Sequence, residues 1–317
     1  RRNFARRHCS AKNLGCAPPS HRNKHCTGHT PISIGKRTGS IIAAEISTGV
    51  CAVLNMLFPW QHYPLLKQLV RRDILGRYRT SMLGMLWSIL GPLSMLAVYT
   101  FVFVGVFRSR WPGGSEGSGL EFALQVFAGL LVFNLFAEVA NRAPGLILEQ
   151  TNLVKKVAFP LQVLPWTAVL GACFHAGSNL LILLAAIFWQ QGHLPLSLLA
   201  IPLILLAFLP FLLGIAFLLA ALGPYIRDIA QAMGMLVSFT MFLSPVFYPV
   251  KALPEHLRYL LQLNPLTPII ENLRRCLLGN QWPVWGWLAL YAVLSSLLFV
   301  LGGYCFNYLR KGFADVV

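Results

Sequence analysis

Charged residues, and acidic residues above all, are scarce in this 317-residue sequence. Asp and Glu together number 10 against 26 Lys and Arg, and charged residues make up 11% of the chain, whereas hydrophobic residues make up 56%. A soluble domain of this composition could not bury its apolar side chains and still cover its surface with polar groups. The lack of charge therefore excludes an ordinary soluble protein and predicts an all-α integral membrane protein.

The motifs of several enzyme and binding classes are missing as well. Among the membrane spans predicted below, only Glu121 and Glu138 are acidic, and no Asp-x-Asp pair occurs of the kind that a membrane-embedded glycosyltransferase would use for metal or base chemistry. The stretch "TPISIGKRT" (30–38) lacks the glycine and the Ser/Thr that frame a phosphate loop, and the spacing from Cys9 to Cys16 does not fit a zinc finger. We therefore expect no catalytic residue, no metal, no cofactor and no nucleic-acid partner for this chain.

Basic residues are concentrated at the start of the sequence. Residues 1–55 hold nine Lys and Arg against one acid, Glu45, and have no sustained apolar run before residue 50, so they are not a secretory signal peptide. Met56 opens a segment that is typical of a natural N-terminus. We interpret residues 1–55 as a non-native or disordered basic leader and residues 56–317 as the functional domain.

Six apolar stretches have roughly the 20 residues that a bilayer crossing needs. They are approximately Met82–Phe107, Leu120–Ala140, Leu161–Trp189, Leu196–Leu222, Ile229–Tyr248 and Val284–Leu309. We expect Pro92, Pro165, Pro202 and Pro210 to tilt or break the longer ones. The side that carries both termini has eleven Lys and Arg near the spans and the other side has six, so both termini are predicted to be cytosolic.

The stretch "RRDILGRYRTSMLGMLW" (71–87) brings four arginines to the start of the first span. Each charge placed at mid-bilayer would cost about 2.5–3.5 kcal/mol, so we expect these side chains at or outside the membrane surface. Apolar residues recur upstream at helical spacing, opposite a charged face, which predicts an amphipathic interface helix over 63–75 and a turn at Gly76. The alternative is simple anchoring by positive charge. The residues assigned to this element are Leu66, Val70, Arg72, Asp73, Arg77 and Arg79.

Two loops are too apolar to be simple connections. In "NRAPGLILEQTNLVKKVAFP" (141–160) we predict a short helix between Pro144 and Pro160 that inserts into a partner protein; a second helix resting on lipid headgroups is the alternative. Its apolar set is Leu146, Leu153, Val154 and Val157, edged by Glu149, Lys155 and Lys156. Residues 250–283 are predicted to form two short half-helices that are hinged at Asn264-Pro265 and dip into the outer leaflet.

Two sets of side chains within the spans are candidates for contacts there. Tyr99 and Phe103 of the first span are candidates to line a channel, because sugar rings stack their C–H faces on aromatic rings; lipid-facing or packing positions are the alternative. His175 and Asn179 lie four residues apart on one helix face, which favours an interhelical hydrogen bond over a functional relay.

Five motifs in order resemble the permease subunits of type-2 ABC exporters, specifically those for O-antigen, capsular polysaccharide and teichoic acid. The motifs are "LVRRDILGRYRTSMLGMLWSILGP" (69–92), "NLVKKVAFPLQVLP" (152–165), "GPYIRDI" (223–229), "LSPVFYP" (243–249) and "NPLTPIIENLRRCLLG" (264–279). The resemblance covers residues 60–317 and identifies 56–317 as an ABC-2 type transmembrane domain.

The resemblance implies a homodimer that docks two separately encoded ATPase subunits, which bind ATP and Mg²⁺. The dimer would move a polysaccharide, such as an undecaprenyl-linked glycan, across the bacterial cytoplasmic (inner) membrane. Segment 63–75 would be the interface helix and 145–156 the coupling helix, with Leu146, Glu149, Asn152, Leu153, Lys155 and Lys156 as ATPase-coupling residues. Segment 250–280 would form the periplasmic gate, with Pro254, Leu260, Asn264 and Pro265 as gate residues. The alternative within this fold is an exporter of a lipo-oligosaccharide or a small hydrophobic molecule.

Overall fold

The computed structural model describes residues 60–79, 82–106, 119–151, 159–193, 195–226, 228–250 and 254–313, all within the compact unit Thr48–Val317. The predicted leader and the coupling residues Asn152, Leu153, Lys155 and Lys156 lie outside these ranges. Within them the regular structure is helical throughout and contains no strand, as the all-α prediction requires.

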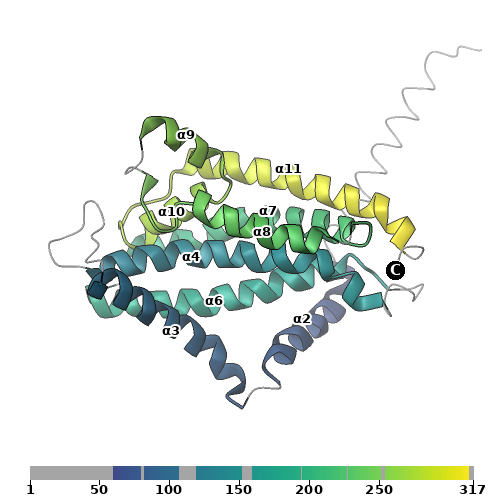
Figure 1. Ribbon diagram of the computed structural model, residues 1–317, viewed down its shortest axis with the longest axis horizontal. Helices are drawn as coiled ribbons and strands as arrows, with labels where there is room; N and C mark the ends of the chain where they lie inside the picture. The colour runs from purple at the N-terminus through teal and green to yellow at the C-terminus, as the bar shows by residue number, and fades with distance from the viewer. Residues whose placement is uncertain are drawn as a thin grey trace, which may run out of the picture. The chain divides into compact units, whose positions relative to one another are not determined.

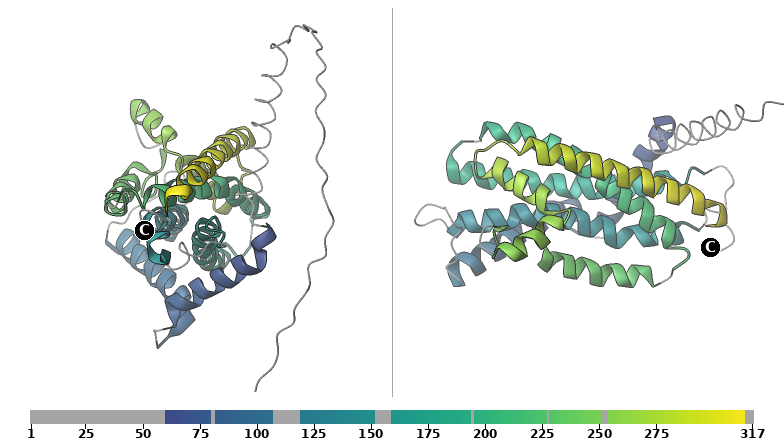
Figure 2. Two further views of the ribbon diagram at one scale, coloured as in Figure 1. Left: turned by 90° about the vertical axis from the view of Figure 1, so that its right-hand side faces the viewer. Right: turned by 90° about the horizontal axis from the view of Figure 1, so that it is seen from above.

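Nine α-helices and several shorter turns make up the described ranges (Figure 1). The α-helices are α2 (Tyr63–Tyr78), α3 (Trp87–Thr100), α4 (Gly119–Arg142), α6 (Val163–Gln191), α7 (Ile201–Leu222), α8 (Ile229–Leu243), α9 (Glu255–Leu263), α10 (Thr267–Leu277) and α11 (Trp285–Leu309). A π-helical segment, Phe101–Val106, extends α3. Helices α4, α6, α7, α8 and α11 run lengthwise beside one another, and α9 and α10 lie at one end of this bundle (Figure 2).

Four helical segments are long and apolar enough to cross a membrane. They are Gly119–Gly145, Val163–Gln191, Leu196–Leu222 and Trp285–Gly312, and they correspond to four of the six predicted spans. The other two predicted spans coincide with shorter apolar helices, Gly84–Thr100 and Ile229–Leu243. The chain is therefore a multi-pass membrane protein.

Helix α4 is the centre of the bundle. Sixteen of its 24 residues are buried, because α3, α6, α7, α8 and α10 all pack against it. Its mixture of large and small apolar side chains, such as Phe127 beside Ala128 and Gly129, allows neighbours to approach on every side.

Two glycines, Gly214 on α7 and Gly302 on α11, allow these helices to pack closely. A Cβ atom built on Gly302 would lie 2.5 Å from the carbonyl oxygen of Gly214, and one built on Gly214 would lie 2.9 Å from the backbone of Leu298. The two backbones can approach this closely only because both positions lack side chains.

The prolines, which were predicted to tilt or break the longer spans, do not break the helices. Pro165 and Pro202 lie in the first turns of α6 and α7, where the missing N–H has no helical partner to lose. Pro92 and Pro210 lie inside α3 and α7, and each helix continues past its proline.

A turn was predicted at Gly76, but the chain does not turn there. Helix α2 continues through that residue to Tyr78, three residues beyond the predicted end. The left-handed backbone conformation that a turn needs is found instead at Gly84, where φ is +50°. This extra turn of α2 carries Arg77 toward α4 and α6, with the consequences described next.

Candidate functional site

Helix α2 packs against α6 through its apolar face and runs obliquely to it (Figure 1). Leu66 and Leu69 are buried against the core, and Val70 is half-buried beside them. The opposite face, which includes Lys67 and Arg72, is exposed. Tyr63, placed by the sequence on the apolar face, is 58% exposed, because the packing on α6 begins one turn later.

Five charged or titratable side chains join α2 to α4 and α6. We refer to Asp73, Arg77, Glu138, Arg142 and His175 as the charge cluster. Arg142 Nη1 donates a hydrogen bond of 2.7 Å to Asp73 Oδ2, and its Nη2 donates to Asp73 Oδ1, which makes this a two-point ion pair. Arg77 Nη2 lies 2.6 Å from Glu138 Oε1, one turn before Arg142 on α4. Two oppositely oriented ion pairs therefore connect the same two helices.

His175 brings α6 into the cluster. Its Nδ1 lies 3.0 Å and 3.1 Å from the two carboxylate oxygens of Glu138. Because an ionised carboxylate only accepts hydrogen bonds, Nδ1 must carry the proton. The ring of Tyr78 on α2 meets the imidazole edge-on at 6.1 Å, and burial raises the pKa of the Tyr78 hydroxyl above its ordinary value. The expected interhelical hydrogen bond of His175 is therefore confirmed, with Glu138 as its partner.

A glycine on α6 makes room for the pair of Asp73 and Arg142. A Cβ atom at Gly171 would lie 2.9 Å from Asp73 Oδ2 and 3.7 Å from Arg142 Nη1. The carboxylate of α2 can thus reach α4 only where α6 lacks a side chain.

Asp73 and Arg77, which were predicted to remain at or outside the membrane surface together with Arg71, Arg72 and Arg79, are both paired with opposite charges. Asp73 is half-buried, whereas Arg77 stays exposed with its guanidinium on Glu138. The pairing offsets the desolvation that an unpaired charge would suffer. Arg71, Arg72 and Arg79 are exposed.

The predicted coupling segment begins directly beside the cluster. It is described only up to Thr151, as two short 3₁₀ turns, Ala143–Gly145 and Leu148–Gln150. Leu146 is only 5% exposed and belongs to the core of the chain itself, whereas Leu148 and Glu149 are exposed. The outer face of this turn is therefore formed by Leu148 and Glu149 rather than Leu146.

An open depression of about 510 Å³ lies between α2 and this turn. It is lined by Arg72, Asp73, Gly76, Arg77, Arg142, Glu149 and Gln150. The structure thus brings the predicted interface helix and the start of the predicted coupling segment to one place, around Arg142. A close contact fixes the turn to α7: a Cβ atom at Gly223 would overlap the carbonyl oxygen of Pro144.

The predicted hairpin of two short helices occurs as α9 and α10. Asn264 ends α9 and ties the hinge to the end of α8, because its Nδ2 donates to Ser244 Oγ at 2.9 Å and its Oδ1 accepts from the Leu266 N–H at 2.9 Å. Pro254 and Pro265 are exposed, and Leu260 lies within α9. The side chain of Leu260 lies outside the description.

Arg274 of α10 fixes the hairpin to the other end of α4. It is 5% exposed and donates to three backbone carbonyl oxygens: Gln125 at 2.9 Å, Pro245 at 2.6 Å and Val246 at 2.6 Å. Gly129 leaves room for it, since a Cβ atom there would lie 2.6 Å from Arg274 Nη2. Burial lowers the pKa of Arg274 to about 10, which still leaves the guanidinium charged at neutral pH.

Sequence reasoning did not find Arg274 or the cluster. Nothing in the sequence of the predicted half-helices (250–283) distinguishes Arg274 from its exposed neighbour Arg275. Of the channel candidates, Tyr99 packs partly against the core, and Phe103 lies in the π-helical segment with its side chain outside the description. Among the described residues, no group of three His, Cys, Asp or Glu side chains could hold a metal ion.

Comparisons with known proteins identify the architecture to which these elements belong. The model of the family "ABC-2 type transporter" matches residues 64–278, about two thirds of the chain. The chain belongs to the ABC-2 type transporter family. The matched region contains all but the first residue of α2, the whole charge cluster, the start of the predicted coupling segment and the α9–α10 hairpin.

Two relatives resemble this ABC-2 chain over almost their whole length. The O-antigen export system permease protein RfbA of Myxococcus xanthus is 28% identical over 264 residues, which cover 81% of this chain and 97% of that protein. A protein of the same name from Klebsiella pneumoniae is 25% identical over 256 residues, which cover 80% of this chain and 95% of that protein.

Proposed function

We propose that this chain is the permease subunit of an ATP-driven exporter that moves a lipid-linked polysaccharide of the O-antigen type across the bacterial cytoplasmic membrane. One observation carries the proposal: the likeness to the two O-antigen export permeases runs through 95–97% of their length. ATP hydrolysis belongs to a separate partner subunit, and two copies of each subunit form the transporter.

In the proposed topology the chain spans the membrane six times, with both termini in the cytosol. Helix α3 with its π-helical extension, and α8, supply the two spans that are shorter than the others. Both helices expose apolar side chains, among them Phe101 on the extension and Phe239 and Phe242 on α8. These faces are available to lipid and to the second copy of the dimer.

The charge cluster is proposed to transmit the motion of the ATPase. A partner that seats against Glu149 and the exposed face of α2 pushes on two elements that the pair of Asp73 and Arg142 holds together. Because Arg77, Glu138 and His175 extend the same cluster to α6, a push on α2 is shared by α4 and α6. The ends of both spans then move with the interface helix. The hairpin of α9 and α10 is proposed as the periplasmic gate.

The experiment begins with deletion of the gene in its own host. We expect loss of surface O-antigen and accumulation of its lipid-linked form on the cytosolic side, and the wild-type chain should restore export. If surface O-antigen is unaffected and a lipo-oligosaccharide or a small hydrophobic molecule is retained instead, the substrate assignment is wrong.

Glu149→Lys tests the coupling role in the same strain. Glu149 is exposed, so the substitution should leave membrane insertion intact while it abolishes export and substrate-stimulated ATPase activity of the purified complex. Asp228→Lys is the matched control, because Asp228 is equally an exposed acid but precedes α8 and does not line the depression. Export by the Glu149→Lys chain at the level of the control would contradict the role.

A further inference from the structure

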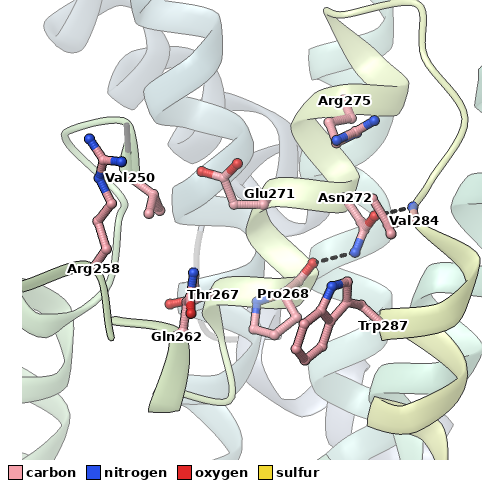
Figure 3. A pocket seen from close by; sticks show the side chains of 10 residues that line it. All are labelled: Val250, Arg258, Gln262, Thr267, Pro268, Glu271, Asn272, Arg275, Val284 and Trp287. Carbon is pink, nitrogen blue, oxygen red and sulfur yellow. Dashed lines mark hydrogen bonds between the residues drawn. The ribbon is translucent and has the colours of Figure 1, made fainter. Parts of the chain in front are cut away.

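A pocket of about 440 Å³ lies between α9, α10 and the start of α11 (Figure 3). Its volume falls within the roughly 300–1,000 Å³ that small-molecule sites occupy. Six of its lining residues carry polar or aromatic groups that could bind a ligand: Arg258, Gln262, Glu271, Asn272, Arg275 and Trp287. The charge cluster lies at the opposite end of α4, so this pocket is a separate site.

The walls of the pocket are held in place by hydrogen bonds. Asn272 joins two of its sides: its Nδ2 donates to the Pro268 carbonyl at 2.7 Å, and its Oδ1 accepts from the Val284 N–H at 2.8 Å. Thr267 Oγ1 donates to the Leu261 carbonyl at 2.6 Å and so closes α10 onto α9. Because Arg274 also fixes α10 to α4, the pocket is preformed and does not need a ligand to assemble it.

The groups that remain for a ligand combine polar edges with one flat aromatic surface. Figure 3 shows Glu271 projecting from α10 into the space toward α9, and Trp287 beside Pro268 at the base of α11. Glu271 makes no ion pair with Arg275, one turn further along α10, within the described part of the chain. The indole of Trp287 is 64% exposed. Carboxylate, amide and guanidinium groups offer both acceptors and donors at the rim.

A sugar ring matches this combination. Its hydroxyl groups need donors and acceptors together, and its C–H face stacks on an aromatic ring. A purely anionic ligand could pair with Arg258 and Arg275 but would leave the Glu271 carboxylate without a donor, and a purely apolar one would leave the polar groups of Glu271 and Gln262 unpaired.

We propose that this pocket binds saccharide units of the exported glycan on the outer side of the membrane, with Trp287 as the stacking surface and Glu271 as the acceptor for ring hydroxyls. The statement that the bound glycan is the exported one rests on the proposed function, whereas the binding itself requires only this chain. A site there holds the emerging polymer beside the hairpin and disfavours its backward movement.

Binding can be measured with the full chain in nanodiscs made of zwitterionic lipid and with O-antigen polysaccharide released from its lipid by mild acid. Saturation-transfer NMR and titration of tryptophan fluorescence should show saturable binding. Trp287→Ala should weaken it roughly tenfold or more, as truncation of an aromatic anchor does, and Glu271→Gln should weaken it while keeping the shape of the side chain.

Trp285→Ala is the matched control. Trp285 begins the same helix and is 48% exposed, but it pairs with Trp282 at 6.4 Å and does not line the pocket. Tryptophans at this level also anchor membrane proteins at the lipid interface. Equal losses for Trp285→Ala and Trp287→Ala would therefore overturn the proposal in favour of anchoring.

Two further outcomes also overturn the proposal: no saturable binding of any O-antigen polysaccharide by the wild-type chain, or displacement by glycerophosphoglycerol, which would identify a lipid-headgroup site. Failure of the proposed function is distinguishable, since it appears as normal O-antigen export in the deletion strain. Glycan binding that depends on Trp287 would stand even then.

Discussion

The two ends of α4 hold an arginine in different ways. At one end Arg142 is partly exposed and pairs with the side-chain carboxylate of Asp73. At the other end, Arg274 is enclosed and donates to three backbone carbonyl oxygens. Side-chain ion pairs can be remade in a new geometry, whereas backbone carbonyls move only with their whole segments. The comparison indicates that the end at the charge cluster can shift and that the end at the hairpin is fixed.

The charge cluster and the α9–α10 hairpin both contact α4. Gln125, which receives Arg274, and Glu138 of the cluster are 13 residues apart on α4, or about 20 Å along its axis. In the proposed mechanism, α4 is the helix through which a displacement of the cluster would reach the hairpin.

Arg274→Ala should have the largest effect of the changes considered. It leaves three buried carbonyl oxygens without their donor, at a cost of about 3 kcal/mol or more in the free energy of unfolding. Thermal unfolding in detergent should show a clear loss of Tm, and expression should fall. Arg275→Ala is the control, because Arg275 is the next residue in the chain and its side chain is exposed. A Tm equal to that of the control would mean that the hairpin end is not fixed by this residue.

Arg142→Ala should come next and should act on function as well as on stability. The carboxylate of Asp73 is left without its partner in a partly buried place, which costs about 2–3 kcal/mol, and substrate-stimulated ATPase activity should fall strongly.

The exchanged double variant Asp73→Arg/Arg142→Asp tests whether the pairing itself matters. It restores opposite charges and should recover a measurable part of both Tm and activity. Recovery of Tm without any recovery of activity would show that the pair is structural only.

Two glycine substitutions compare the ends directly. Gly129→Ala places a methyl group 2.6 Å from Arg274 and 3.2 Å from the Val246 backbone, and overpacking of this kind costs about 1–3 kcal/mol. Gly171→Ala meets only the ends of the Asp73 and Arg142 side chains, which can move, so its loss of Tm should be smaller.

Gly177→Ala is the control for both, since nothing lies within 4 Å of a Cβ atom there. A larger loss of Tm for Gly171→Ala than for Gly129→Ala would reverse the assignment of the fixed and the adjustable end.

His175→Asn should have the smallest effect. It removes one interhelical hydrogen bond to Glu138 while Arg77 remains, and such bonds contribute about 0.6 kcal/mol in membrane proteins. Glu138→Gln should cost more, because it also removes the partner of Arg77. A loss of Tm for His175→Asn as large as for Glu138→Gln would indicate that His175 is the centre of the cluster.

The features of the fold that depend on a local sequence pattern could be predicted. The apolar runs located four long membrane helices, and the break at Asn264 separated two short helices, because helix length and chain reversal are encoded by neighbouring residues. The helical spacing of Leu66 and Leu69 placed the packed face of α2.

What could not be predicted depends on pairs of distant residues. Asp73 meets Arg142 across 69 positions, and Arg274 meets Gln125 across 149, so no local pattern distinguishes these side chains from exposed charges. Leu146 was assigned to an outer surface because its burial depends on how the turn folds back onto the bundle.

The enclosure of α4 also sets an order of assembly. During synthesis α4 follows α3 but precedes α6, α7, α8 and α10, so the faces that these four helices later cover first meet lipid. The Gln125 carbonyl receives its arginine only when α10 has been made, near the end of the chain. A polypeptide truncated before residue 274 consequently has its central helix in the bilayer but lacks the donor that completes the surroundings of that helix.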